Sequence, residues 1–173
     1  MTTNSQDRAT SEQADFLQTL RTHRDFLRFT LRDLSDEQAA QRTTVSELCL
    51  GGLIKHVAAV ESNWTDFILN GPTDRSSHDQ QAGDWAAGFH MEPGEHVSAL
   101  LDHYDTVATR TDDVVSGLPD LDQSHPLPEA PWFEAGATWS ARRVLLHIIA
   151  ETAQHAGHAD IIRESIDGSK TMG

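Results

Sequence analysis

Residues 147–164 read HIIAETAQHAGHADIIRE, and the spacing within this stretch decides the fold. An α-helix turns by about 100° per residue, so four ionisable side chains fall within one arc of about 80°: His147, Glu151, His155 and His158. Val144 and Ile162 share this side of the helix, which makes it the face that packs into the protein. The stretch therefore predicts a long helix with a row of ionisable groups on its buried face.

Three further stretches have helical periodicity and end at residues that begin or stop helices. They run from about Ser11 to Leu34, from about Ser46 to Asn70, and from about Pro93 to Gly117. Ser140 caps the last helix, and Asp167-Gly168 ends it. Long connections follow the second and third helices, which suits a chain that crosses from one end of a bundle to the other. The sequence predicts an all-α fold, a four-helix bundle with at least one crossover.

Length and charge limit the classes of partner. The chain has 173 residues and a formal net charge of −14, from 27 acidic against 13 basic residues. This field repels phosphate backbones and anionic lipids, so we expect neither nucleic acid nor a membrane as partner. The single cysteine and the polar N-terminus predict a cytoplasmic protein without disulfides. We expect residues 1–10 to form a disordered tail and residues 11–173 a single domain.

Three local features near the helix starts allow alternatives. Gly51 and Gly52 fit either a frayed first turn or a close backbone approach to a neighbouring helix or a ligand. Cys49 is more typical of a small buried side chain than of a nucleophile. Arg142 and Arg143 could attract an anionic substrate locally, but ordinary solvated charge at a helix start is the preferred interpretation.

The ionisable row on the last helix predicts a metal site, because such groups are costly on a buried face unless they pair or bind a metal. A histidine and a carboxylate four residues apart can hold one ion, but a third ligand must come from another helix. His56 shares a face with Leu53 and Val60, so it points inward from the second helix. Together, His56, Glu151 and His155 would leave a coordination position open, as catalytic zinc sites do.

The same residues could instead form a buried polar network without a metal, although their number favours the metal. His147 and His158 lie on the same face, and either could replace one of the three ligands. We expect both beside the metal, as hydrogen-bond partners of a ligand or as a proton shuttle in catalysis.

These residues resemble the DinB-like superfamily, closest to the branch that contains mycothiol-dependent maleylpyruvate isomerase. The resemblance rests on His56, Glu61 and Trp64 in the second helix and on the motif of residues 147–164. It implies an up-down-down-up bundle in which a second-helix histidine and two residues four apart on the last helix bind a divalent metal. By position these are His56, Glu151 and His155. Many members carry three histidines there, so the glutamate favours the isomerase-like branch.

The resemblance implies an S-transferase or isomerase that uses a low-molecular-weight thiol of the mycothiol type. The expected cofactor is zinc, with nickel, iron or manganese as alternatives, because the metal would activate the thiolate at neutral pH. The expected partners are the thiol cosubstrate and a small-molecule electrophile, and the resemblance also admits a homodimer. Two other functions stay open: a metal-dependent hydrolase, and a metal- or ligand-binding stress protein without turnover.

Overall fold

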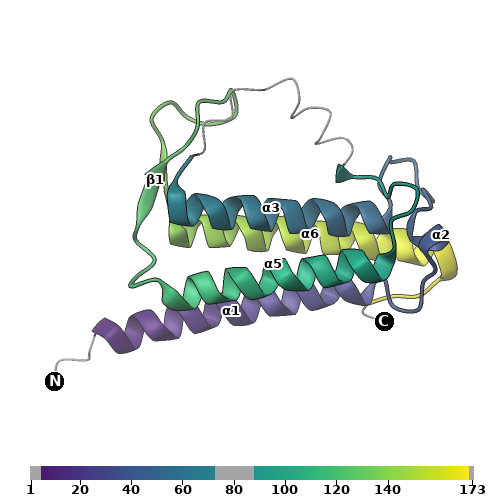
Figure 1. The fold of residues 1–173 in the computed structure, drawn as a ribbon, viewed down its shortest axis with the longest axis horizontal. Coiled ribbons are helices and arrows are strands. Elements are labelled where there is room, and N and C mark those ends of the chain that lie inside the picture. Colours follow the sequence, from purple (N-terminus) through teal and green to yellow (C-terminus); the bar gives the residue numbers. More distant parts are fainter. Residues whose placement is uncertain (1–4, 73–87, 172–173) are drawn as a thin grey trace.

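Four long helices dominate the computed structural model, which describes residues 5–72 and 88–171 (Figure 1). They are α1 (Ser5–Phe29), α3 (Leu50–Asn70), α5 (Val97–Gly117) and α6 (Ala141–Asp167). A single short turn of helix, α2 (Asp36–Ala39), lies between α1 and α3. Two short strands, β1 (Ser124–Pro126) and β2 (Thr138–Ser140), lie between α5 and α6. The predicted all-α class is confirmed.

The helices pack in a ring, α1 on α6, α6 on α3 and α3 on α5, with a smaller contact between α5 and α1. In Figure 1, α1 and α6 run in one direction while α3 and α5 run in the other. This is the predicted up-down-down-up course. Since α3 and α5 are parallel, the chain must return along the bundle between them, as the long connection indicated. Residues 73–87 of that polar connection lie outside the described residues.

The predicted start and end of the last helix are confirmed by its caps. The Ser140 hydroxyl accepts a hydrogen bond from the backbone N–H of Arg143 at 3.2 Å, which satisfies one free donor of α6. At the other end of α6, Gly168 takes a left-handed conformation with φ of 78°. Ser35 caps α2 in a reciprocal capping box with Gln38.

Three predicted helix starts are wrong, and the first long helix ends at Phe29 rather than near Leu34. The α3 helix begins after Cys49, whose sulfur accepts from the Gly52 N–H at 3.4 Å, while the Ser46 hydroxyl bonds to Thr44 and to a nearby backbone N–H. The third long helix begins at Val97 rather than near Pro93, because the chain turns at Gly94 with φ of 90°.

The N-terminal helix begins at Ser5, so its first turns fall inside the stretch expected to be a tail. Residues 1–4 lie outside the described residues. The division into a tail and one domain stays a prediction.

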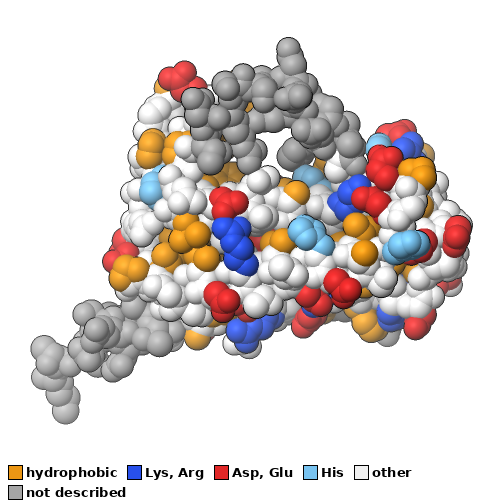
Figure 2. Space-filling model, viewed as in Figure 1, with side chains coloured by type: hydrophobic (Ala, Val, Ile, Leu, Met, Phe, Trp, Pro, Cys, Tyr) orange, Lys and Arg blue, Asp and Glu red, His pale blue; other side chains and the backbone are white. Residues whose placement is uncertain are grey.

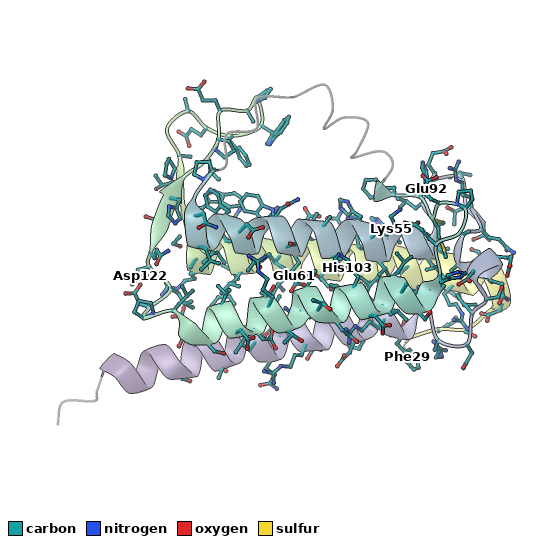
Figure 3. The ribbon with its side chains drawn as sticks, in the orientation of Figure 1. Phe29, Lys55, Glu61, Glu92, His103 and Asp122 are labelled. Atoms are coloured by element: carbon teal, nitrogen blue, oxygen red, sulfur yellow. The ribbon has the colours of Figure 1, made fainter. Side chains whose placement is uncertain are left out.

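Apolar side chains of all four long helices fill the bundle, and a buried ion pair crosses it. The main members of the core are Leu20, Leu27, Leu53, Ile54, Ile68, Tyr104, Leu145, Ile148 and Ile162. Among them, Arg24 donates to both oxygens of Glu61, at 3.2 and 2.5 Å, and to Asp112 at 2.8 Å. Figure 3 places Glu61 between α3 and α5. Glu61, which the family resemblance singled out, therefore joins α3 to α1 and lies away from the surface.

The strands β1 and β2 form an antiparallel pair in the α5–α6 connection, with His125 opposite Trp139. Periodicity gave no sign of them, because each has only three residues. Their effect is to hold Trp139 just before α6, where its ring stacks on Trp64 of α3 at 4.9 Å.

The outer surface carries much of the negative charge. Figure 2 shows acidic side chains scattered over the viewed face, several of them beside Lys or Arg, rather than gathered in one patch. Among the described residues, no helix is both long enough and apolar enough to cross a membrane.

Candidate metal centre

The fold brings His56 of α3 together with Glu151 and His155 of α6. One ligand atom from each of the three side chains can be chosen so that all lie within 4.8 Å of one another. The Nε2 atom of His155 is 3.5 Å from Glu151 Oε2, and the His56 and His155 ring centroids are 4.7 Å apart. Atoms this close can share one ion after small side-chain shifts, so the geometry agrees with the ligand set expected from the sequence.

The side chains in and beside this cluster differ in their exposure to solvent, and the difference shows from which side solvent reaches the cluster. His56 and His155 are only 4% and 7% exposed. The side chains of Glu151 and His147 are 29% and 26% exposed. The cluster is therefore closed on the His56 side and accessible on the side of Glu151 and His147.

Burial keeps the two inner imidazoles neutral. It lowers the pKa of His56 to about 4, with a smaller effect from neighbouring His155. Burial also lowers the pKa of His155, although the Glu151 carboxylate opposes this change. Near pH 7 both rings thus have a lone pair to donate, and a carboxylate completes the set. This donor chemistry fits a divalent cation.

Phe89 covers the closed side of the cluster. Its ring stacks on His56 with centroids 4.1 Å apart and an angle of 23° between the planes. Gly52 permits this approach, because a Cβ atom there would lie 1.9 Å from the Phe89 carbonyl oxygen. Gly52 therefore allows a close backbone approach, but the neighbour is a connecting segment and not the helix or ligand that was predicted. Both glycines also lie in the first turn of α3.

Lys55 of α3 binds the segment that follows Phe89 through two hydrogen bonds. The Lys55 Nζ donates to the His90 carbonyl oxygen at 3.0 Å and to Glu95 at 2.8 Å. In Figure 3, Lys55 and Glu92 lie at the same end of the bundle. This anchoring fixes the position of Phe89 over His56.

His147 and His158 flank the cluster on opposite ends of the ionisable row. His158 Nδ1 lies 3.4 Å from His155 Nδ1. The other ring nitrogen of His155, Nε2, faces Glu151. His147 Nε2 lies 3.8 Å from Glu151 Oε1. The His147 ring also meets Trp64 and Trp139 edge-on, at 5.0 and 5.2 Å. Burial lowers the pKa of His147.

Sequence reasoning missed Phe89 and the contact between Arg143 and Trp139 beside the cluster. Phe89 follows a polar connection without periodicity, so nothing in the sequence indicated its contact with His56. Arg143 lies with its guanidinium carbon 4.2 Å from the centroid of the Trp139 ring, an arrangement that depends on the unpredicted strands. Cys49 is buried, as expected, and its thiol serves as a helix cap.

Comparison with known proteins identifies the family. A family model described as mycothiol-S-transferase matches residues 15–168. The chain belongs to the mycothiol-S-transferase family. A crystal structure of a conserved protein from Enterococcus faecalis superposes with a TM-score of 0.67, at 14% sequence identity, covering 89% of this chain and 96% of that chain. At this identity the likeness shows a shared fold alone. No curated protein matches the chain.

Membership in the mycothiol-S-transferase family confirms the DinB-like resemblance. The cluster in this family member is compatible with a divalent metal, and its donors leave the identity of the metal open. Two imidazoles and one carboxylate accept zinc, iron, nickel or manganese, and affinity order alone does not choose among them.

Proposed function

We propose that the protein conjugates a low-molecular-weight thiol of the mycothiol type to an electrophile, with a divalent metal as cofactor. The observation that carries this proposal is the convergence of His56, Glu151 and His155 inside a member of the mycothiol-S-transferase family. We propose zinc as the metal, and these three side chains as its ligands. We further propose a cytoplasmic location, since free thiols persist in a reducing compartment.

The three protein ligands leave room for a further ligand on the accessible side. A bound divalent cation would supply positive charge that lowers the pKa of a thiol and favours its thiolate near pH 7. Phe89 excludes water from the opposite side by covering His56. The cosubstrates would therefore meet on the side of Glu151 and His147.

The remaining histidines have distinct roles in this proposal. His147 is half-buried on the accessible side, and its lowered pKa keeps it neutral near pH 7, so it can accept the thiol proton. His158 orients the His155 ring through Nδ1. In the transfer, the S–H proton goes to His147, a sulfur–carbon bond forms, and the leaving group departs with the electron pair of its bond to carbon.

Metal analysis and a thiol-dependence assay test this proposal together. We expect about one divalent metal per chain and conjugation of an electrophile only when the thiol is added. His155→Ala should lose both the metal and the turnover. His103→Ala is the matched control, because His103 is an exposed histidine on α5. Full metal occupancy in His155→Ala would exclude this ligand set.

The same assay separates the alternatives. Cleavage of an ester or amide without any thiol would favour a metal-dependent hydrolase. A metal or ligand that raises the melting temperature, with no turnover of either kind, would favour a non-catalytic binding protein. Size-exclusion chromatography tests the homodimer that the family resemblance admits.

A further inference from the structure

Arg143 differs from the other arginines whose side chains the structure describes. Most of these donate to a carboxylate: Arg21, Arg24, Arg28, Arg42, Arg110, Arg142 and Arg163. Arg32 instead donates to the backbone carbonyl oxygens of Phe29 and Lys170. Among the residues whose side chains the structure describes, 11–72 and 88–171, none accepts either kind of contact from the Arg143 guanidinium, and the Arg143 backbone N–H donates to the Ser140 hydroxyl.

The composition of the chain makes this exception informative. Acidic residues outnumber basic residues by 27 to 13, so a carboxylate is available to almost any exposed cation. The neighbouring Arg142 follows the rule: it donates to both oxygens of Glu12, at 2.5 and 3.0 Å, and pairs with Asp122. The five N–H donors of the Arg143 guanidinium therefore have no carboxylate or carbonyl acceptor among the described residues.

The Arg143 side chain is also held in place. Its guanidinium carbon lies 4.2 Å from the centroid of the Trp139 ring, a cation–π contact. Trp139 is fixed in turn by β2 and by stacking on Trp64. A cation that is already fixed loses less side-chain entropy when it binds a partner, so this arrangement favours an anion that arrives later.

The position of Arg143 connects it to the metal centre. Arg143, His147 and Glu151 follow at intervals of four residues along one side of α6. With a rise of about 1.5 Å per residue, Arg143 lies about 6 Å along the axis from His147 and about 12 Å from Glu151. A molecule that reaches from Arg143 to the cluster thus has the length of a one- or two-ring organic compound.

We propose that Arg143, held on the Trp139 ring, binds an anionic group of the electrophile, which is therefore an organic anion. The rest of the molecule extends past His147, and the reactive carbon lies at the metal centre. The net charge of −14 repels such a molecule at long range, so a guanidinium without a carboxylate partner among the described residues is what makes its binding favourable. The location of the reactive end rests on the proposed transferase function, but anion binding at Arg143 needs no turnover.

Equilibrium binding of an unreactive probe pair tests this inference. The probes are para-nitrobenzoate and its neutral amide, which share one ring and have no leaving group, and tryptophan fluorescence quenching reports their Kd values. We expect the wild-type protein to bind the carboxylate at least about tenfold more tightly than the amide, as a charge-assisted contact provides. Arg143→Gln should bring the ratio of the two Kd values close to one, and Arg143→Lys should retain part of the preference.

Arg21→Gln is the matched control, because it removes another exposed arginine, on α1, and should keep the wild-type ratio. The preference in the wild-type protein should also weaken as salt is raised. No preference in the wild-type protein, or the same preference in Arg143→Gln, overturns the inference, and the wild-type result stands whether or not a variant folds.

The outcomes separate this inference from the proposed function. If the carboxylate preference holds while no thiol-dependent turnover occurs, Arg143 is an anion site and the transferase proposal fails. If turnover occurs and the preference is absent, the transferase proposal stands and the anionic substrate is wrong.

Discussion

Replacing Gly52 with alanine tests how tightly the Phe89 segment is seated on α3. An added Cβ atom would lie 1.9 Å from the Phe89 carbonyl oxygen and 2.2 Å from the Phe89 carbonyl carbon. Ordinary contact begins at 3.4 Å, so one of the two backbones must move by about 1.5 Å. Because both neighbours are backbone atoms, no rotamer change can relieve the clash.

The expected cost follows from two opposing effects. Overpacking of this kind costs about 1–3 kcal/mol, and loss of the Phe89–His56 stacking adds up to about 1 kcal/mol. Alanine regains at most about 1 kcal/mol in helix propensity, and less in the first turn of a helix. We therefore expect Gly52→Ala to lower the free energy of unfolding by about 2 kcal/mol.

Two other glycines provide matched comparisons. Gly157, in the middle of α6, has nothing within 4 Å of an added Cβ, so Gly157→Ala should stabilise the protein by about 0.5–1 kcal/mol. At Gly51 the Cβ would lie 2.7 Å from Met91 Sδ, the flexible part of a side chain that can rotate away. Gly51→Ala should therefore fall between the other two variants.

Urea unfolding followed by circular dichroism measures all three differences. The experiment is done with a chelator present, because a bound metal would stabilise the variants unequally. A Gly52→Ala protein as stable as the wild type, or as stable as Gly51→Ala, would show that the Phe89 segment is not seated on α3 as described.

Three further predictions concern the metal centre and the buried ion pair. Chelation should lower the melting temperature of the wild-type protein but leave that of His155→Ala unchanged, because only the intact cluster binds the metal. In the metal-free protein, the pKa of His56 is about 4 in the folded state and 6.5 when unfolded, so the unfolded state binds more protons. Stability should therefore fall as the pH falls from about 6.5 towards 4, and His56→Gln should flatten this slope in urea unfolding. Arg24→Met leaves the Glu61 carboxylate buried without its cation, which should cost about 3 kcal/mol or more, whereas adding Glu61→Leu should recover part of this loss.

Each of these has an outcome that contradicts it. A chelator that lowers the melting temperature of wild type and His155→Ala equally would place the metal elsewhere. An unchanged acid slope in His56→Gln would assign the slope to other groups. A double variant less stable than Arg24→Met would show that the apolar pair does not fit the space.

Periodicity predicted the long helices well, because each buries one face and therefore repeats every 3.6 residues. Periodicity also placed His56 on the buried face of its own helix and the ionisable row on the buried face of α6. Because both faces point into the same bundle, the candidate ligands could be predicted to meet. The start of α3 was wrong because several adjacent residues can cap a helix, and only the fold decides whether Ser46 or Cys49 does so.

Side-chain partners could not be predicted in the same way. Arg142 and Arg143 are adjacent and chemically identical, yet one pairs with Glu12 and Asp122 while the other lies on Trp139. That difference depends on α1 and on β2, which are distant in the sequence. Phe89 is similar, since its contact with His56 depends on a segment without periodicity.

The four-residue spacing along α6 explains why the metal centre opens where it does. Each step of four residues turns the helix by about 400°, so successive members of the row are rotated by about 40°. From His155 to Arg143 the total rotation is about 120°, enough to carry the row from the core to the surface. The exposures follow this rotation: His155 is buried, Glu151 and His147 are half-buried, and Arg143 is exposed. A candidate metal ligand at the buried end and, at the exposed end, an arginine with no carboxylate partner among the described residues are therefore two consequences of one spacing.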